Sequence, residues 1–249
     1  MVSWDEKFSR WKSYFNFNLN ELSGLITAAV VTGFIFSFRD WGGDTFNFFL
    51  GLQHLILAIL AAGIIFFVRS SLQKTYGLAE GYKVEFKPFW GGIIIALVVA
   101  FITNGLIPLV IIGGTTVIFI TKQRMGEYRY GFSYWNNGII SLWVIYSAVI
   151  MAIIFGLGLH FFPENYFFGK GVLISILMGF FALLPIPQMD AYSIYFAATW
   201  LYLVALGIMI FATLLIFLSI LTKSLIGLII LIIFGAIAGF IYYMVGSEK

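Results

Sequence analysis

The stretch FALLPIPQMDA, residues 181–191, interrupts an apolar segment with two prolines and then supplies a single carboxylate. Proline has no backbone N–H to donate and its ring clashes with the preceding helical turn, so Pro185 and Pro187 predict the end of a helix. Asp190 is the only acidic residue between positions 165 and 247. A lone carboxylate at the edge of an apolar segment indicates a functional site. The plainer alternative is a solvated aspartate in a short turn.

The composition around this stretch is that of a membrane protein. Of 249 residues, 61% are hydrophobic and only 10% are charged, which excludes a soluble domain of this size. The chain has no cysteine, so it has neither disulfides nor a thiolate metal site. The net charge of +3 is small and does not indicate nucleic-acid binding. We therefore predict an all-α polytopic protein whose first partner is the lipid bilayer.

Six apolar segments are long enough to be read as transmembrane helices. They lie at about residues 22–38, 46–68, 138–162, 171–184, 194–221 and 225–245. The uncharged stretch 89–120 is too long for one ordinary span, so it is either a span plus a re-entrant piece or two short spans. The expected total is six to eight. Between them, residues 82–87 alternate in polarity and predict a short membrane-associated β element.

The chain divides into three parts. In residues 1–20, aromatic side chains recur at helical spacing, which predicts an amphipathic helix that lies at the membrane interface or docks on the membrane domain. Residues 21–221 form one membrane domain, and residues 222–249 add a C-terminal transmembrane helix. Lysine and arginine concentrate in segments 1–21, 69–88 and 121–137. We expect the protein to lie in the cell membrane, and the positive-inside rule places these segments and the N-terminus on its cytoplasmic side. This orientation requires residues 89–120 to return to the side of the membrane that they left.

Several motifs together resemble one enzyme family. Residues 182–191, ALLPIPQMDA, resemble the signature N-L-L-P-I-P-P-L-D-G of the site-2 proteases, which are intramembrane zinc metalloproteases. ELSGLI at 21–26 is similar to their opening E-L-x-x-L-L-I, and QKTYG at 73–77 is similar to K-x-V-A-x-K-Y-G. AEGYKVEFK at 79–87 resembles the strand W-A-E-F-R, and 126–136 resembles G-E-I-x-x-A-G-P-L-T-N. The likeness covers about residues 20–220 and is nearest to an archaeal-type subgroup.

The resemblance implies that the catalytic centre has been lost. The family's H-E-x-x-H aligns with Ile65, Phe66 and Arg69, counted back from the Tyr-Gly pair. Isoleucine and phenylalanine have no lone pairs and arginine stays protonated, so these residues cannot bind zinc or activate water. The retained family residues are Asn136, Pro185, Pro187 and Asp190, of which Asp190 matches the third zinc ligand. We therefore expect no catalytic residue and no bound zinc.

Two further hypotheses concern the charged and imidazole side chains. Arg69 and Asp190 occupy positions that in the family converge on one metal, so we expect them to form an ion pair, since a buried unpaired charge is costly. Otherwise Arg69 extends to the interface as an ordinary helix-end cation. The only histidines are His54 and His160, and a relocated zinc site of His54, His160 and Asp190 is the alternative. Without it, both histidines are polar residues satisfied within the bundle or at the interface.

These observations predict a catalytically inactive, site-2-protease-like membrane protein. It binds a membrane client, such as another protein's transmembrane segment, or serves as a subunit of a membrane complex. One alternative is an active intramembrane metalloprotease with a non-standard zinc site. Another is a small transporter or channel, which the scarcity of intramembrane charges disfavours.

Overall fold

The computed structural model describes residues 4–42, 46–120 and 133–247, with side chains described over 7–42, 46–120 and 133–237. The fold is mostly helical with one two-stranded sheet. In chain order the elements are α1 (Trp4–Tyr14), α2 (Leu19–Ser37), α3 (Phe48–Ala79), β1 (Tyr82–Pro88), α4 (Trp90–Ile102), β2 (Gly113–Phe119), α5 (Tyr134–Phe161), α6 (Tyr166–Ala182), α7 (Asp190–Ala197), α8 (Thr199–Thr222) and α9 (Ile226–Ser247).

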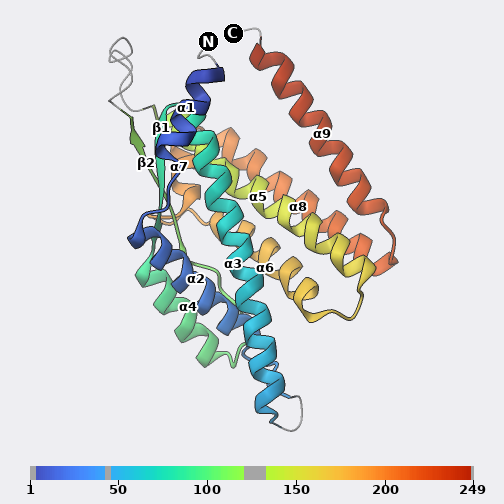
Figure 1. Cartoon of the computed structure of the whole chain (residues 1–249). Coiled ribbons are helices and arrows are strands. Elements are labelled where there is room, and N and C mark those ends of the chain that lie inside the picture. Colours follow the sequence, from blue (N-terminus) through green and yellow to red (C-terminus); the bar gives the residue numbers. More distant parts are fainter. Residues whose placement is uncertain (1–3, 43–45, 121–132, 248–249) are drawn as a thin grey trace.

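Helix α3 is the axis of the molecule. Its 32 residues span about 48 Å at ~1.5 Å per residue. In Figure 1, α2, α4 and the β-ribbon lie on one side of α3, while α5, α6 and α8 lie on the other. Helix α1 and the C-terminal part of α9 lie at the same end of the molecule. Because α3 has neighbours on both sides, its charged residues can reach partners in several elements.

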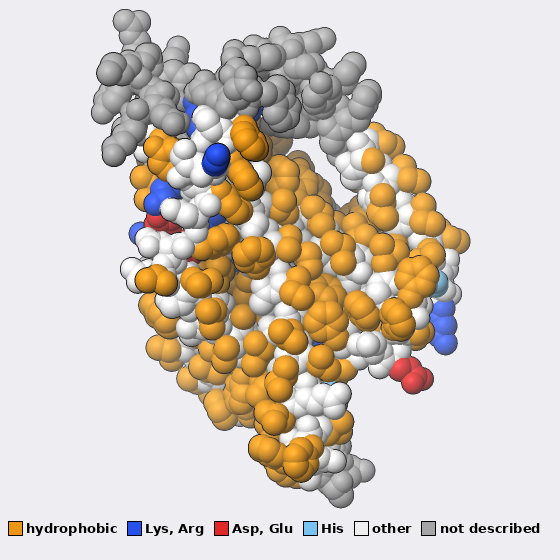
Figure 2. Space-filling model, in the orientation of Figure 1, with side chains coloured by type: hydrophobic (Ala, Val, Ile, Leu, Met, Phe, Trp, Pro, Cys, Tyr) orange, Lys and Arg blue, Asp and Glu red, His pale blue; other side chains and the backbone are white. Residues whose placement is uncertain are grey.

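The structure confirms a mostly helical protein, and its long apolar helices indicate that it is embedded in a membrane. Among the described residues, four helices are long and apolar enough to cross a bilayer, namely α2, α3, α5 and α8. Helix α6 has only 17 residues, and α9 has an apolar described portion of residues 226–237. The expected six to eight spans are therefore not reached by these four long helices. The face in Figure 2 is covered mainly by hydrophobic side chains, with charged ones gathered at the upper left and the right edge.

Residues 89–120 leave the sheet and come back to it. Strand β1 was predicted over 82–87 and is confirmed, but its antiparallel partner β2 was not expected from the sequence. In the register, Tyr82 pairs with Phe119 and Pro88 with Gly113, so the segment between the strands starts and ends at the same level. Its helix α4 has 13 residues, about 20 Å, which is short of the ~30 Å hydrocarbon core. A single crossing is thus excluded, as the charge pattern required.

The structure extends the second predicted span and shows where the N-terminal helix lies. Helix α3 does not end near Val68 but continues to Ala79, because Arg69 and Lys74 of this extension are buried in ion pairs rather than left in a loop. Helix α1 packs on α3 and leaves Phe8 and Trp11 exposed. The docking alternative is therefore observed for residues 4–14, with two aromatic side chains free to face lipid.

Helices α2 and α3 come into close backbone contact at a glycine. A Cβ on Gly33 would lie 2.7 Å from the backbone N and Cα atoms of Ile59. Backbone atoms cannot move aside as a flexible side chain can, so this crossing admits glycine alone.

We predict that Gly33→Ala destabilises the protein by about 1–3 kcal/mol, because the added methyl group forces the two helices apart. The measurement is the midpoint of thermal unfolding in detergent micelles. Gly207→Ala is the matched control: this glycine lies within α8, and a Cβ added there would have no packing neighbour within 4 Å. There alanine, the better helix former, should leave the midpoint unchanged or raise it. Equal midpoints for the two variants would contradict the close crossing.

Candidate functional site

The proline stretch delivers Asp190 into the protein interior. Helix α6 ends at Ala182, and α7 begins with Asp190 itself. Pro185 and Pro187 lie in the connection, while Gln188 adopts a left-handed conformation with φ 74°. Asp190 retains only 1% of its surface exposed, so the alternative of a solvated aspartate is wrong.

Arg69 on α3 pairs directly with Asp190. Its Nη2 atom donates to Asp190 Oδ2, and also to the carbonyl oxygen of Gly113 at 2.9 Å. The guanidinium lies 5.6 Å from the centre of the Phe86 ring, within cation–π range. Arg69 is 1% exposed, so it does not extend to the membrane interface. The sequence hypothesis of an Arg69–Asp190 pair thus describes the observed contact.

The second carboxylate oxygen of Asp190 is also occupied. Asp190 Oδ1 accepts hydrogen bonds from the Thr115 hydroxyl at 2.8 Å, from the Thr115 backbone N–H at 3.2 Å and from Gln73 Nε2 at 3.4 Å. With Arg69 on Oδ2, the carboxylate has four donors, about as many as its lone pairs accommodate. A carboxylate saturated in this way has no free position for a metal ion.

A second buried ion pair lies beside the first. Lys74 Nζ lies 2.6 Å from Glu21 Oε2, and it also donates to the Asn16 carbonyl at 2.5 Å. Its ammonium group lies 4.1 Å from the centre of the Phe17 ring. Both charged side chains are 3% exposed. The other Glu21 oxygen, Oε1, accepts the backbone N–H of Phe86 at 2.9 Å.

The two pairs hold the β-ribbon from its two edges. Phe86 of β1 and Thr115 of β2 are cross-strand partners, yet their N–H groups donate to Glu21 and Asp190 rather than to each other. In an antiparallel pair such N–H groups point away from the partner strand, toward opposite edges. Each edge carboxylate is neutralised by a cation of α3. We call Glu21, Arg69, Lys74 and Asp190 the charge clamp.

Two glycines allow β2 to approach the clamp. Gly113 has φ 131°, and a Cβ there would collide with the Lys87 carbonyl oxygen. A Cβ on Gly114 would lie 2.7 Å from the Gln188 carbonyl oxygen and 3.0 Å from the backbone N of Asp190. The Gly-Gly pair is therefore required where the strand passes the first turn of α7.

The other residues singled out in the sequence lie in different places. Ile65 and Phe66 are buried on α3, with Ile65 one helical turn before Arg69. Asn136, in the first turn of α5, donates from Nδ2 to the Tyr82 hydroxyl at 3.2 Å and does not contact the clamp. Of the segment 126–136 used in the resemblance, residues 126–132 lie outside the described residues, as do the basic residues of 121–132.

The alternative zinc site is wrong. In the part of the chain that the structure describes, no group of three histidine or acidic side chains is placed to hold a metal ion. His54 contacts the backbone oxygen of Asp40 through Nδ1 at 2.8 Å and stacks on Tyr166 with ring centres 4.0 Å apart. His160 borders a pocket between α5, α8 and α9. Histidines in separate polar environments cannot share one ion with Asp190.

Sequence reasoning missed half of the clamp. Gln73, Thr115 and the Glu21–Lys74 pair lie in segments quoted for the resemblance or close to them, but no local signal assigned them a role. The hydrogen bonds that involve them join residues 53 to 117 positions apart, from α2, α3, β1, β2 and α7. The available hint was two basic residues and one glutamine at the start of the polar segment that was expected to follow the second span.

We predict that breaking the clamp from one side is worse than removing the pair. Arg69→Met or Asp190→Asn alone should destabilise the protein by about 3–5 kcal/mol, because each leaves a buried charge without its partner. The double variant should be more stable than either single variant. The measurement is a double-mutant cycle of unfolding free energies in detergent micelles.

The control for this cycle is a more exposed pair in the same region. Lys83 Nζ lies 2.7 Å from Glu85 Oε1, and these side chains are 34% and 22% exposed. Lys83→Met should change stability by only about 0–1 kcal/mol. Additive effects at Arg69 and Asp190 would show that the two charges do not depend on each other.

Comparison of the chain with protein-family models, with curated proteins and with solved structures finds no match in any of the three.

Proposed function

We propose that this chain is a non-hydrolytic, site-2-protease-like membrane protein that binds an extended segment of a membrane client. One observation carries the proposal: an arginine cation neutralises Asp190, at the two positions that the motif resemblance aligns with zinc ligands. The guanidinium would take the place of the metal ion and pair with the buried carboxylate without providing a Lewis acid.

The chemistry of the neighbouring residues supports a loss of hydrolysis. Proteolysis by a metal centre needs imidazole or carboxylate ligands and a general base for the bound water. Ile65 and Phe66 supply neither, and Asp190 is engaged by Arg69, Thr115 and Gln73. Among the described residues, no group of three histidine, aspartate or glutamate side chains is placed to hold a metal ion. The arrangement favours holding a peptide over cutting it.

The free part of the β2 edge supports client binding. Thr115 uses its outward N–H for Asp190, and Val117, two residues on, has the same orientation. Within the described residues, the backbone N–H and C=O of Val117 have no hydrogen-bond partner. A strand edge of this kind recruits an extended peptide as a further strand, through main-chain hydrogen bonds. The clamp holds the adjacent part of the same strand in place.

We also propose the number of spans and the side of the membrane on which the N-terminus lies. Helices α6 and α9 would be the fifth and sixth spans, and the N-terminus would lie in the cytoplasm of the cell. The return of residues 89–112 to the sheet supports this orientation, because it leaves the basic segment 69–88 and the end of β2 on the same side of the membrane.

Restoring the metal ligands tests the alignment on which the proposal rests. The variant Ile65→His, Phe66→Glu, Arg69→His recreates H-E-x-x-H one turn apart on α3 and beside Asp190. It should bind about one zinc ion per chain, whereas the unmodified protein should hold less than about 0.1. Elemental analysis of purified protein measures both values.

Adding Asp190→Ala to the triple variant is the control and should abolish zinc binding. A folded triple variant without zinc would contradict the alignment with the protease family. Stoichiometric zinc in the unmodified protein, lost in Asp190→Ala, would instead favour the active metalloprotease.

Client binding is tested at the strand edge by photo-crosslinking in native membranes. A benzoylphenylalanine at position 118, where Ile118 is 49% exposed, should yield one crosslinked species of defined mass. Val117→Pro should abolish it, because proline removes the outward N–H while the inward ladder stays intact. Val117→Ala should retain it. The same probe at Leu214, on the exposed face of α8, controls for contacts with random lipid-embedded neighbours. A crosslink that survives Val117→Pro would exclude strand addition.

A further inference from the structure

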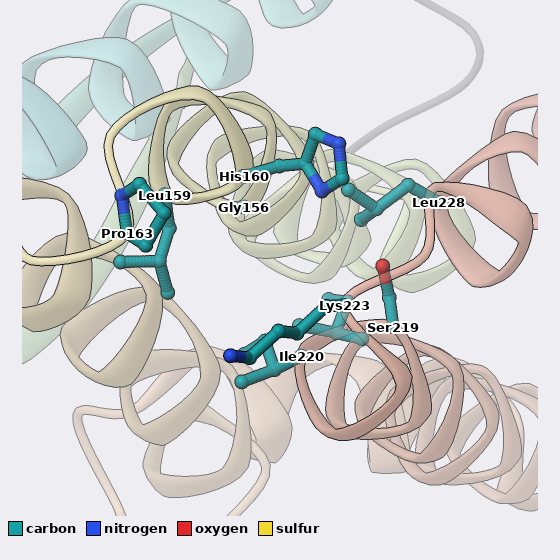
Figure 3. A pocket seen from close by; sticks show the side chains of 9 residues that line it. Gly156, Leu159, His160, Pro163, Ser219, Ile220, Lys223 and Leu228 are labelled. Carbon is teal, nitrogen blue, oxygen red and sulfur yellow. The ribbon is translucent and has the colours of Figure 1, made fainter.

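A pocket of about 360 Å³ opens between the ends of α5 and α8 and the start of α9, away from the clamp. Figure 3 shows the side chains around it. Most of the lining is apolar. It consists of Gly156 and Leu159 from α5, Pro163 from the connection after α5, Ile216 and Ile220 from α8, and Leu228 from α9. The three polar members are His160, Ser219 and Lys223. Its volume falls within the usual range for small-molecule sites, which are mainly apolar with a few polar groups.

Close helix packing keeps the walls of this pocket in place. A Cβ on Gly227 would collide with the Leu215 carbonyl oxygen, so α9 starts in direct backbone contact with α8. On the other wall, a Cβ on Gly156 would meet Leu228 at 3.3 Å. Two glycines thus fix where α9 leaves α8 and how it meets α5.

The two basic side chains at the pocket are available to a ligand. Ser219 donates its hydroxyl to the Ser224 carbonyl at 2.5 Å and is occupied. Across the described residues, His160 and Lys223 have neither a side-chain hydrogen bond nor an ion pair. In Figure 3 the His160 ring and the Lys223 chain come from opposite walls and border the same space. An apolar pocket bordered by two unpartnered bases suits a ligand with an apolar body and an acidic group.

Lys223 stands in a backbone conformation that would favour glycine. It ends α8 with φ 49°, ψ 31°, the left-handed cap at which glycine is the usual residue. Lysine near a helix C-terminus is stabilised by the helix dipole, which is the purely structural explanation. That explanation accounts for the charge, but not for a side chain that lines the pocket opposite His160.

The level of the pocket points to the same class of ligand. The long apolar helices α5 and α8 both end there, at Phe161 and Thr222. The ends of spanning helices lie at the membrane–water interface, where lipid head groups are found. An acyl chain can therefore enter the pocket from the bilayer while its acidic group stays beside Lys223.

We infer that this pocket binds an acyl chain whose acidic head group, a carboxylate or a phosphate, pairs with Lys223 and His160. A free fatty acid and an anionic phospholipid share this chemistry. The inference rests on the pocket alone and is independent of the client-binding function.

Photo-labelling of the purified full-length chain in a neutral detergent tests the inference. The probe is palmitic acid with a diazirine at the end of its chain, and its uncharged methyl ester is the comparison. We expect palmitate to label α5, α8 and α9 around the pocket. Lys223→Met should reduce labelling about tenfold, because it removes a charge-assisted hydrogen bond. Lys223→Arg should restore most of it.

The control variant is Lys87→Met, an exposed lysine on β1, which should label as the unmodified protein does. Ile216→Trp, which fills the pocket, should prevent labelling in a protein that still elutes as a folded species. Equal labelling by acid and ester, or equal labelling of Lys223→Met and the unmodified chain, would overturn the inference.

The source of the acyl chain is decided by competition. Unmodified palmitate and palmitoyl-lysophosphatidylglycerol are each added during labelling, and the stronger competitor identifies the preferred head group. Failure of both to displace the probe would also overturn the inference. Native mass spectrometry of protein extracted from its own membrane then gives the mass of the lipid that stays bound.

Discussion

A charge that leaves water for an apolar interior must find a partner, and this requirement organises one end of the molecule. Helix α3 carries Arg69 and Lys74 into that interior, and each has a carboxylate partner from a distant segment. Glu21 and Asp190 in turn accept N–H groups from the two outer edges of the β-ribbon. Breaking any one of these contacts would leave several buried polar groups without a partner. The relative placement of α2, α3, the ribbon and α7 therefore depends on two neutralised pairs.

The opposite end of the bundle is held by different contacts. Asp40, after α2, is paired with Lys170 at 2.6 Å and accepts the Tyr166 hydroxyl at 2.7 Å, which ties α2 to α6. Further along that end, α5, α8 and α9 leave the apolar pocket bordered by His160 and Lys223. Between the two ends the helices pack through small residues such as Gly33, because apolar side chains gain little from leaving lipid and close backbone contact must supply the attraction. Polar contacts thus hold the helices together at the two ends of the bundle, and close packing of small residues holds them together in the middle.

Part of this arrangement could be predicted from local sequence. The two prolines and the isolated Asp190 indicated a helix break that delivers one carboxylate, and alternation indicated β1. The partner Arg69 was expected only because motif spacing aligned it with a metal-binding position. Strand β2 and the roles of Thr115, Gln73, Glu21 and Lys74 were missed, because Gly113–Phe119 has no alternating pattern and the contacts join distant segments. The sequence predicted six to eight spans, and four of the described helices are long and apolar enough to cross a bilayer. Hydropathy alone does not show that residues 89–112 turn back.

Composition and hydrophobic length by themselves determined that this protein is helical and embedded in a membrane, since a chain so poor in charge has no other stable environment. They also determined where a helix must stop, because proline lacks the hydrogen-bond donor that a helix needs. Only the tertiary structure decided which charges are neutralised by which partners, whether the histidines meet and where a pocket remains. Those properties depend on distances between residues far apart in the chain, and a distance of a few ångströms separates a saturated ion pair from a metal site.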